Sequence, residues 1–224
     1  EGTIFFPEEL IIRITAPIFQ AQLVETRIIN ILQFQTMIAS KAARMTLAAP
    51  EKQLVDFGLR RAHGAEAGLF AARASYLAGF NGTSTVLAGK MYGIPVFGTM
   101  AHSFIQAHDS EILAFEHFAE SQPDNVVLLI DTYDTEKGAD KVVALAPRLA
   151  EKGIIIKGVR LDSGDMILHA KKVRRILDQG GLTDVRILTS GNLDEYKLAE
   201  FSQADAPIDG FGVVTSMITS ADAP

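Results

Sequence analysis

The sequence contains no cysteine, which excludes disulfide frameworks, thiolate zinc sites and cysteine nucleophiles. Basic residues are also few: 21 lysines and arginines face 27 aspartates and glutamates, giving a formal net charge of -6. This balance argues against a nucleic-acid surface, because phosphate backbones are bound by clustered basic side chains. No apolar run approaches the roughly 20 residues that span a membrane. We therefore expect a cytoplasmic protein without nucleic-acid or membrane partners.

Neither end of the sequence looks like the end of a complete protein. The chain opens at Glu1 with no initiator methionine and no signal-peptide pattern. It stops at Pro224, soon after an expected strand and without a helix to cover that strand. A parallel strand normally has both faces covered. We therefore expect a chain that is truncated at both ends.

Residues 1–50 are expected to form an N-terminal region of their own. Two β-prone runs between Thr3 and Thr15, separated by Pro7, predict a hairpin of two strands. From Pro17 to about Ala48, apolar side chains recur at spacings of three to five residues, which predicts one long helix. Proline fits the start of a helix, where its missing N–H is not needed.

Residues 51–224 alternate between short apolar runs and helical patterns. Hydrophobic residues make up 48% of the sequence, enough for a sizeable core. Strands are expected at residues 54–57, 94–97, 126–130, 154–161, 185–188 and 208–213, and helices at residues 65–77, 85–92, 110–121, 137–151, 166–178 and 193–202. Repeated strand–helix units predict an α/β fold with a parallel sheet or barrel.

The loops that follow the expected strands collect polar residues. They carry two arginines, a histidine, several carboxylates and Gly-Ser turns, in segments 56–64, 98–103, 131–135, 160–165, 189–192 and 212–216. Each loop alone also fits the cap of the following helix. Together they offer what a phosphorylated sugar needs, because arginines bind phosphate, helix N-termini accept anions and carboxylates bind hydroxyls or Mg²⁺. In a βα barrel, the catalytic residues lie on the loops that follow the carboxyl ends of the strands, which is where these segments are expected.

At these motifs the chain resembles nicotinate phosphoribosyltransferases from end to end. The matching segments are Phe34-Gln35-Thr36, Lys41-Ala42-Ala43-Arg44, Asp56 to Gly64, Gly82 to Gly89, Gly93 to Val96, Gly98 to Ser103, Leu129 to Thr135, Gly158 to Asp165, Thr189 to Leu193 and Asp209 to Val213. One such motif alone is weak, whereas several long motifs in the same order are specific.

The resemblance implies an irregular α/β barrel of the type II phosphoribosyltransferase kind, with part of a β-rich accessory domain. It implies the formation of nicotinate mononucleotide and pyrophosphate from nicotinate and phosphoribosyl pyrophosphate (PRPP), a step of NAD salvage. ATP as co-substrate, Mg²⁺ as cofactor and a homodimer with shared active sites are implied as well. Glycosyl transfer of this kind depends on positioning, and no strong general base is required.

The resemblance also implies roles for individual residues. His102 would be the histidine that ATP phosphorylates, and Arg160 and Asp162 would contact the phosphoribosyl group. Asp131 would face the ribose and its Mg²⁺. The substrate-binding set would be Phe57 stacking on the pyridine ring, Arg60 holding the nicotinate or phosphate end, Ser84 at the carboxylate, and Ser190, Gly191, Gly210 and Gly212 around the 5′-phosphate.

Two departures from the family pattern bear on these roles. The family has Gly-Val-Gly-Thr where this chain has Gly212-Val213-Val214-Thr215, and a Cβ at Val214 would hinder close approach to a phosphate. The N-terminal segment whose tyrosine stacks on nicotinate from a neighbouring subunit is absent. Both departures suit a different function, that of a catalytically silent relative that binds a nucleotide or a partner chain.

His102 and Ser84 are the residues on which competing interpretations depend. Without the resemblance, His102 fits more readily as a core histidine bonded to a carbonyl group.

Nicotinamide and quinolinate phosphoribosyltransferases share the fold and the use of PRPP. The nicotinamide enzymes resemble this chain but carry an aspartate where Ser84 stands, and an aspartate would repel a carboxylate. The quinolinate enzymes lack the His102 loop.

Overall fold

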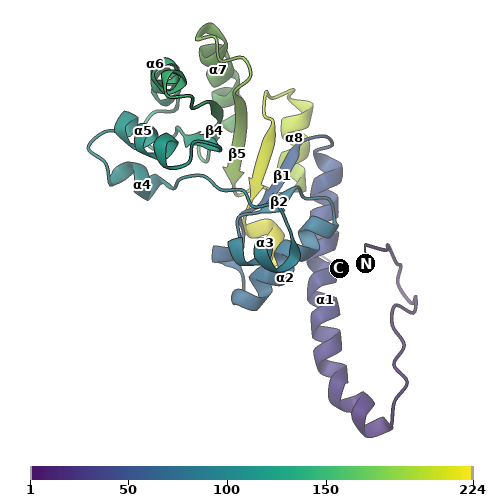
Figure 1. Ribbon diagram of the computed structural model, residues 1–224. Helices are drawn as coiled ribbons and strands as arrows, with labels where there is room; N and C mark the ends of the chain where they lie inside the picture. Colours follow the sequence, from purple (N-terminus) through teal and green to yellow (C-terminus); the bar gives the residue numbers. More distant parts are fainter. Residues whose placement is uncertain (1, 223–224) are drawn as a thin grey trace.

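The computed structural model describes residues 2–222, which form a single parallel sheet flanked by helices (Figure 1). The strands are β1 (Gln53–Asp56), β2 (Gly82–Thr83), β3 (Val126–Leu129), β4 (Ile156–Leu161), β5 (Arg186–Gly191) and β6 (Gly210–Val213). The helices are α1 (Ile18–Ala48), α2 (Ala65–Leu77), α3 (Val86–Tyr92), α4 (His102–Gln106), α5 (Glu111–Ser121), α6 (Thr135–Glu151), α7 (Met166–Gln179), α8 (Glu195–Gln203) and α9 (Thr215–Thr219), with a 3-10 turn, η1 (Leu59–Arg61).

The strand order is β2-β1-β6-β5-β4-β3, and every pairing is parallel. This is the cyclic order of a six-stranded barrel in which β6 returns to β1 and the ring is open between β2 and β3. After β2 the chain forms one further parallel bridge, Thr83 to Val96, and then crosses toward α4. The expected α/β barrel is therefore present as a six-stranded parallel half-barrel.

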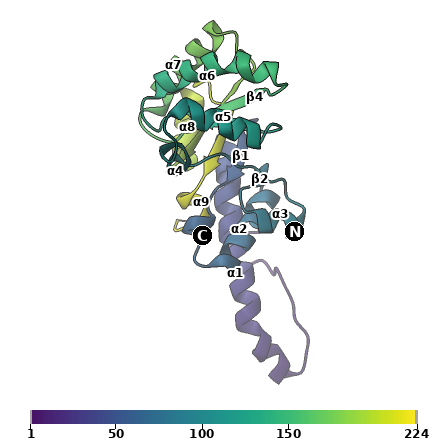
Figure 2. The same ribbon diagram turned by 60° about the vertical axis from the view of Figure 1, so that its left-hand side comes forward.

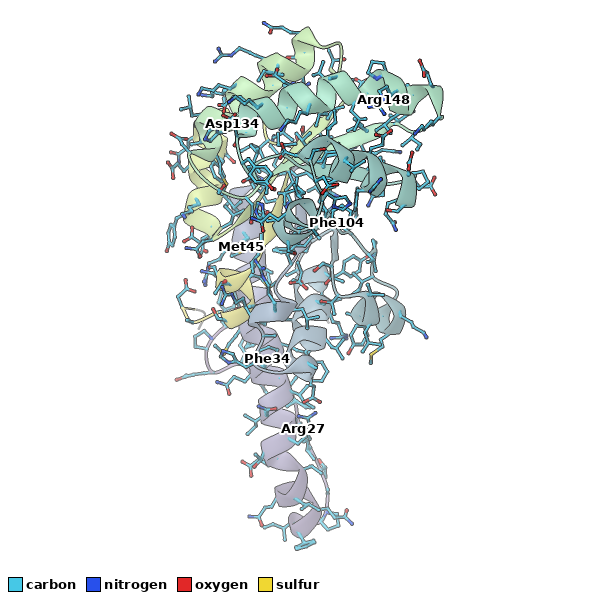
Figure 3. All side chains as sticks on the ribbon, turned by 90° about the vertical axis from the view of Figure 1, so that its left-hand side faces the viewer. Arg27, Phe34, Met45, Phe104, Asp134 and Arg148 are labelled. Carbon is cyan, nitrogen blue, oxygen red and sulfur yellow. The ribbon has the colours of Figure 1, made fainter. Side chains whose placement is uncertain are left out.

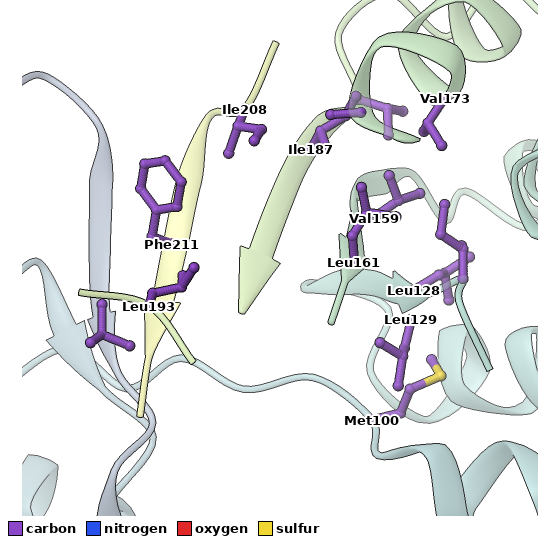
Figure 4. Packing of buried hydrophobic residues seen from close by; sticks show 14 of the residues in the cluster. Met100, Leu128, Leu129, Val159, Leu161, Val173, Ile187, Leu193, Ile208 and Phe211 are labelled. Carbon is purple, nitrogen blue, oxygen red and sulfur yellow. The ribbon is translucent and has the colours of Figure 1, made fainter. Parts of the chain in front are cut away.

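The core lies between the outer face of this sheet and its helices. Alternate residues of each strand point to opposite faces, so Val159 and Leu161 of β4 are fully buried on the helix side. Val173 of α7 lies beside Ile187 of β5 in the same cluster (Figure 4). Both faces of the parallel sheet need cover, and α6, α7 and α8 cover the outer one (Figure 2).

Helix α1 divides into a packed half and a projecting half. Its C-terminal half contributes Ile38, Ala42 and Met45 to the core, all fully buried. Figure 3 shows Arg27, Phe34 and Met45 in succession along the helix, and Phe34 already packs against the core cluster. The projecting half exposes Phe19 and Leu23 to solvent. The division of the chain at residue 50 remains a prediction.

The structure differs from the sequence expectations in several places, and β2 and α4 were not expected at all. No strand forms among residues 2–15. The backbone hydrogen bond found within this segment runs from the Glu9 N–H to the Phe6 carbonyl oxygen. The segment 94–97 makes one bridge rather than a regular strand. A short helix, α9, follows the last strand, which was expected to be uncovered. A β-prone run becomes a strand only when a neighbouring strand pairs with its backbone, and residues 3–15 have none within the described chain.

Among residues 2–222, we find no helix that is both long and apolar enough to cross a bilayer. The longest, α1, has buried Lys41 in its packed half.

Candidate active site

The carboxyl ends of β1, β3, β4 and β5 bring the expected site residues to one edge of the sheet. Asp131 follows β3, Asp162 follows β4, and Ser190-Gly191 ends β5. His102 reaches the same edge from another direction, because it begins α4 after the crossing segment. Residues far apart in the sequence therefore meet where parallel strands place their functional loops.

The imidazole of His102 is held between two side chains. Its Nδ1 lies 3.1 Å from Thr132 Oγ1, and its Nε2 lies 3.5 Å from Asp162 Oδ2. An ionised carboxylate only accepts hydrogen bonds, so Asp162 favours the form of the ring in which Nε2 carries a proton. The side chain is 37% exposed, which leaves it open to an incoming group. The interpretation of His102 as a buried core histidine bonded to a carbonyl does not match these contacts.

Asp162 joins three of the loops. Its Oδ1 accepts a hydrogen bond from Ser190 Oγ at the end of β5. Its backbone N–H donates to Asp131 Oδ2 at 2.7 Å. With His102 on its other oxygen, Asp162 fixes the relative positions of the β3, β4 and β5 loops and α4.

Asp131 is a buried carboxylate with one oxygen in use. Oδ2 accepts from Ser163 Oγ and from the Asp162 amide, both at 2.7 Å, whereas Oδ1 is enclosed and accepts no hydrogen bond. An acceptor oxygen without a donor suits a cation or a hydroxyl group. The described residues form no cluster of three metal-ligating side chains, so a Mg²⁺ at Asp131 would take its remaining ligands from substrate oxygens and water, as this ion commonly does.

Arg160 points along the inner face of the sheet from β4. It donates from NH1 to Thr99 Oγ1 of the crossing segment, while its buried Nε has no partner. Burial lowers the pKa of Arg160, and the negative charges of Asp162 and Asp131 oppose that lowering. An arginine keeps its charge under these conditions. The site thus holds a guanidinium with unused donors.

A second arginine, Arg60, approaches from η1 after β1. Its positive charge adds to the lowering of the Arg160 pKa, so the two cations lie near each other. Arg60 is exposed, and two neighbouring guanidinium groups suit an anionic ligand between them.

Phe57 and the glycines expected around the 5′-phosphate do not all lie at the carboxyl-end edge of the sheet. The Phe57 ring covers Gly212, where a Cβ would lie 2.6 Å from the ring. Gly191 has a φ of +119°, a conformation that favours glycine at the turn after β5. Gly210 opens β6 and pairs with Gln53, so it lies at the far end of the strand from this edge.

Ser84 follows β2 at the same edge, and its amide donates to the Asp56 carbonyl at 2.7 Å. It is half-buried. Val214 follows β6 and is itself buried, 6% exposed, rather than open at the edge.

A cavity of about 460 Å³ opens beneath this edge on the inner face of the half-barrel. Phe97, Gly98 and Thr99 of the crossing segment line it together with residues of all the strands except β2. Such a volume is within the range of small-molecule sites.

Sequence reasoning assigned no role to Thr132 and Thr99, the two hydroxyl groups that hold His102 and Arg160. Both residues lie in the polar loops, yet hydroxyl residues are common in loops and nothing in their spacing distinguishes them. The alternative interpretation of each loop as the cap of the following helix is correct for two of the loop carboxylates. Asp134 and Asp165 accept from the amides of Lys137 and Leu168, so they cap α6 and α7 rather than facing the site.

Comparisons with known proteins agree on one family. The model of the nicotinate phosphoribosyltransferase (NAPRTase) family matches residues 52–217. Nicotinate phosphoribosyltransferase pncB2 of Mycobacterium tuberculosis is 52% identical over 224 residues, covering 100% of this chain and 48% of that protein. The nicotinate phosphoribosyltransferase of Bacillus subtilis is 42% identical, over 100% of this chain and 46% of its own length.

Solved structures of more than one enzyme match the fold. The crystal structure of human nicotinic acid phosphoribosyltransferase matches 95% of this chain and 54% of its own, with a TM-score of 0.87 and 31% identity. A nicotinate-nucleotide pyrophosphorylase from Pyrococcus furiosus matches 84% of this chain and 48% of its own, with a TM-score of 0.72 and 34% identity. The chain spans about half the length of the relatives it matches. It belongs to the nicotinate phosphoribosyltransferase family.

Proposed function

We propose that this chain carries the catalytic half-barrel of a nicotinate phosphoribosyltransferase, which forms nicotinate mononucleotide and pyrophosphate from nicotinate and PRPP with ATP as co-substrate. The observation that carries the proposal is the placement of His102 between Thr132 and Asp162, at the edge that also holds Arg160. Membership of the family supports it.

His102 is the proposed phosphoryl acceptor. A neutral imidazole nitrogen attacks the terminal phosphorus of ATP, and the bond to the departing ADP oxygen breaks. Asp162 and Thr132 hold the ring in one orientation, so the imidazole does not have to be ordered during the reaction. The carboxylate of Asp162 also stabilises positive charge that develops on the ring.

The phosphoribosyl group is proposed to lie between Arg160 and the loop after β5. Unused donors of Arg160 and the cationic Arg60 suit its phosphates. Gly191 offers a glycine turn for the 5′-phosphate, next to Ser190, whose hydroxyl proton is donated to Asp162. The Phe57 ring, which covers Gly212, is proposed to stack on the pyridine. Gly210 is not included, because it lies at the far end of β6.

Mg²⁺ is proposed at Asp131, whose Oδ1 lacks a donor. When bound, the ion supplies charge neutralisation for the leaving pyrophosphate. The pyridine nitrogen of nicotinate is itself nucleophilic and forms the new bond to the ribose carbon as the bond to pyrophosphate breaks. The remaining work of the protein is positioning and electrostatic stabilisation.

Ser84 supports nicotinate over nicotinamide as the acceptor. A serine donates a hydrogen bond to a carboxylate, whereas an aspartate at this position would repel it. A homodimer with shared sites is part of the same proposal and rests on the family resemblance alone.

The proposal is tested by following nicotinate mononucleotide formation from nicotinate, PRPP and Mg-ATP. We expect product with nicotinate but not with nicotinamide. Ser84→Asp should lower kcat/KM for nicotinate by about 100-fold, because a like charge facing the carboxylate costs several kcal/mol. Ser84→Asn, which is similar in size to aspartate but uncharged, controls for bulk. Absence of product in the unmodified chain would favour the interpretation as a catalytically silent relative. Equal effects of the two variants would show that Ser84 does not contact the substrate carboxylate.

A further inference from the structure

A pair of histidines faces each other on the surface where α4 meets α5 (Figure 1). His108 follows the end of α4, and His117 lies in the second half of α5. His108 Nε2 is 3.1 Å from His117 Nδ1, and the two ring centroids are 5.1 Å apart. The pair lies at the opposite end of α4 from His102, which begins that helix.

The hydrogen bond on the other side of the His108 ring fixes its tautomer. Nδ1 lies 2.7 Å from the Phe104 carbonyl oxygen, which can only accept, so Nδ1 carries the proton. In the neutral ring, Nε2 therefore presents its lone pair toward His117. Metal-binding histidines are held in this way, with the other ring N–H donated to a carbonyl group. The Phe104 ring packs against the His108 ring with centroids 4.6 Å apart and further restricts it.

The separation of the two facing nitrogens is close to that of two ligands on one metal ion. Zinc binds imidazole nitrogen at about 2.0 to 2.1 Å, so two such nitrogens on a tetrahedral ion lie about 3.3 Å apart. Binding also needs the lone pair of His117 Nδ1. Because His117 is exposed, water can move its proton from Nδ1 to Nε2, and the ring stays neutral without a net loss of protons.

The charged side chains around the pair come close to balance. Glu116 and Glu120 lie on α5 beside His117, and Arg148 and Lys152 of α6 form ion pairs with them. The hydrogen bond from Lys152 is the main cause that lowers the pKa of Glu120, and the charge of protonated His117 has a smaller effect in the same direction. A cation between the histidines therefore meets balanced charges, with a carboxylate nearby.

We propose that His108 Nε2 and His117 Nδ1 together bind a divalent transition-metal ion that prefers imidazole ligands, as Zn²⁺ does. Among the described residues no third ligating side chain joins the pair, so water completes the coordination and the ion is exchangeable. The site differs in chemistry from the carboxylate of Asp131, because Mg²⁺ prefers oxygen ligands. Its occupation does not depend on whether the chain transfers a phosphoribosyl group.

Zn²⁺ binding, measured by isothermal titration calorimetry near neutral pH, tests the site directly. His108→Gln and His117→Gln should each weaken binding by at least about tenfold, since losing a group that merely orients a metal ligand already costs this much. His63→Gln, at an exposed histidine outside the pair, should leave the affinity within about twofold. His102→Ala reports binding at the active-site edge. Affinity that depends on His102 but not on His108 or His117 would overturn the proposal, as would the absence of binding.

A second measurement uses the unmodified chain, so it does not depend on the folding of a variant. Diethyl pyrocarbonate modifies accessible neutral imidazole rings, and the label at each histidine is read by peptide mass spectrometry. Zn²⁺ should slow the modification of His108 and His117 several-fold, because the ion occupies their lone pairs, while His63 reacts at an unchanged rate. Equal rates at His108 and His117 with and without Zn²⁺ would contradict the site.

Discussion

Asp56 shows how a single buried carboxylate supports the active-site edge. The residue ends β1 and is fully buried. Its Oδ1 accepts from the Gly58 amide at 2.8 Å, and its Oδ2 accepts from Thr83 Oγ1 at 2.7 Å. It thereby fixes the turn that carries Phe57 and ties β1 to β2. Burial is the main influence on its pKa and raises it, although the two hydrogen bonds act in the opposite direction.

The raised pKa of Asp56 gives a pH-dependent prediction. Folding favours the protonated carboxyl, so this group contributes stability below its unfolded pKa of about 3.9, and that contribution is lost as the pH rises through the folded pKa. Asp56→Asn keeps the shape without the charge. Its free energy of unfolding, relative to the wild type, should therefore increase between about pH 4 and pH 7, as measured by urea denaturation.

Asp124→Asn, at an exposed carboxylate, controls for the change in net charge. A difference between Asp56→Asn and wild type that stays constant or falls with rising pH would show that Asp56 does not behave as a buried acid.

Single residues differ in how far the sequence predicts them. The caps Asp134 and Asp165 were predictable, because an N-cap contacts an amide three residues away. The contacts of His102 with Thr132 and Asp162 bridge 30 and 60 residues, and side-chain pairing over such separations is not encoded in local spacing. Gly212 was assigned to a phosphate, yet the space above it is filled by Phe57. The roles of the site residues remain proposals.

Helices α1 and α8 are joined by a buried ion-pair cluster. Lys41 of α1, whose side chain is 3% exposed, lies 2.8 Å from Glu195 Oε2 of α8 and 2.7 Å from Asp222. Arg44 donates to Glu195 Oε1 at 2.8 Å. Burial raises the pKa of Glu195, but the hydrogen bonds from Lys41 and Arg44 outweigh burial, and the net shift is downward. The cluster anchors the packed half of α1 to the barrel.

Glu195→Gln should lower the free energy of unfolding by about 3 kcal/mol at neutral pH, because it leaves the buried Lys41 with Asp222 as its remaining partner. The lowered pKa makes the contribution of Glu195 present above its unfolded pKa of about 4.3, and it is lost as the pH falls through the folded value. The deficit should therefore shrink in acid. Chemical denaturation across this range measures it.

The matched control is Glu66→Gln, which breaks the Arg27–Glu66 pair between α1 and α2. Its side chains are 53% and 60% exposed, so the expected loss is below about 1 kcal/mol. Equal losses for the two variants would show that the α1–α8 cluster is no more important than a surface pair.

Elements with strong local signals were predicted closely. Helix α2 has the expected bounds, and α7 differs by one residue at its end. Prediction failed where a strand depends on a distant partner, as in residues 3–15 and 94–97. It also missed α4 and α9, whose five residues are too few to show a helical period.

The arrangement of the whole sheet explains why the site forms at one edge. All six strands run parallel, so all their carboxyl ends face the same side. The sequence predicts parallel strands from the strand–helix rhythm. Strand order was not predictable, because the return of β6 to β1 is a contact between residues more than 150 positions apart. The opening between β2 and β3 is crossed by the segment that carries Thr99 and leads to His102.

The central claim is that His102 accepts a phosphoryl group from ATP. The most direct measurement is the intact mass of the purified chain after incubation with Mg-ATP, with His102→Ala treated in the same way. Our account predicts a gain of one phosphoryl group that is labile in acid and absent from the variant. No gain in the wild type, or an equal gain in His102→Ala, would contradict it.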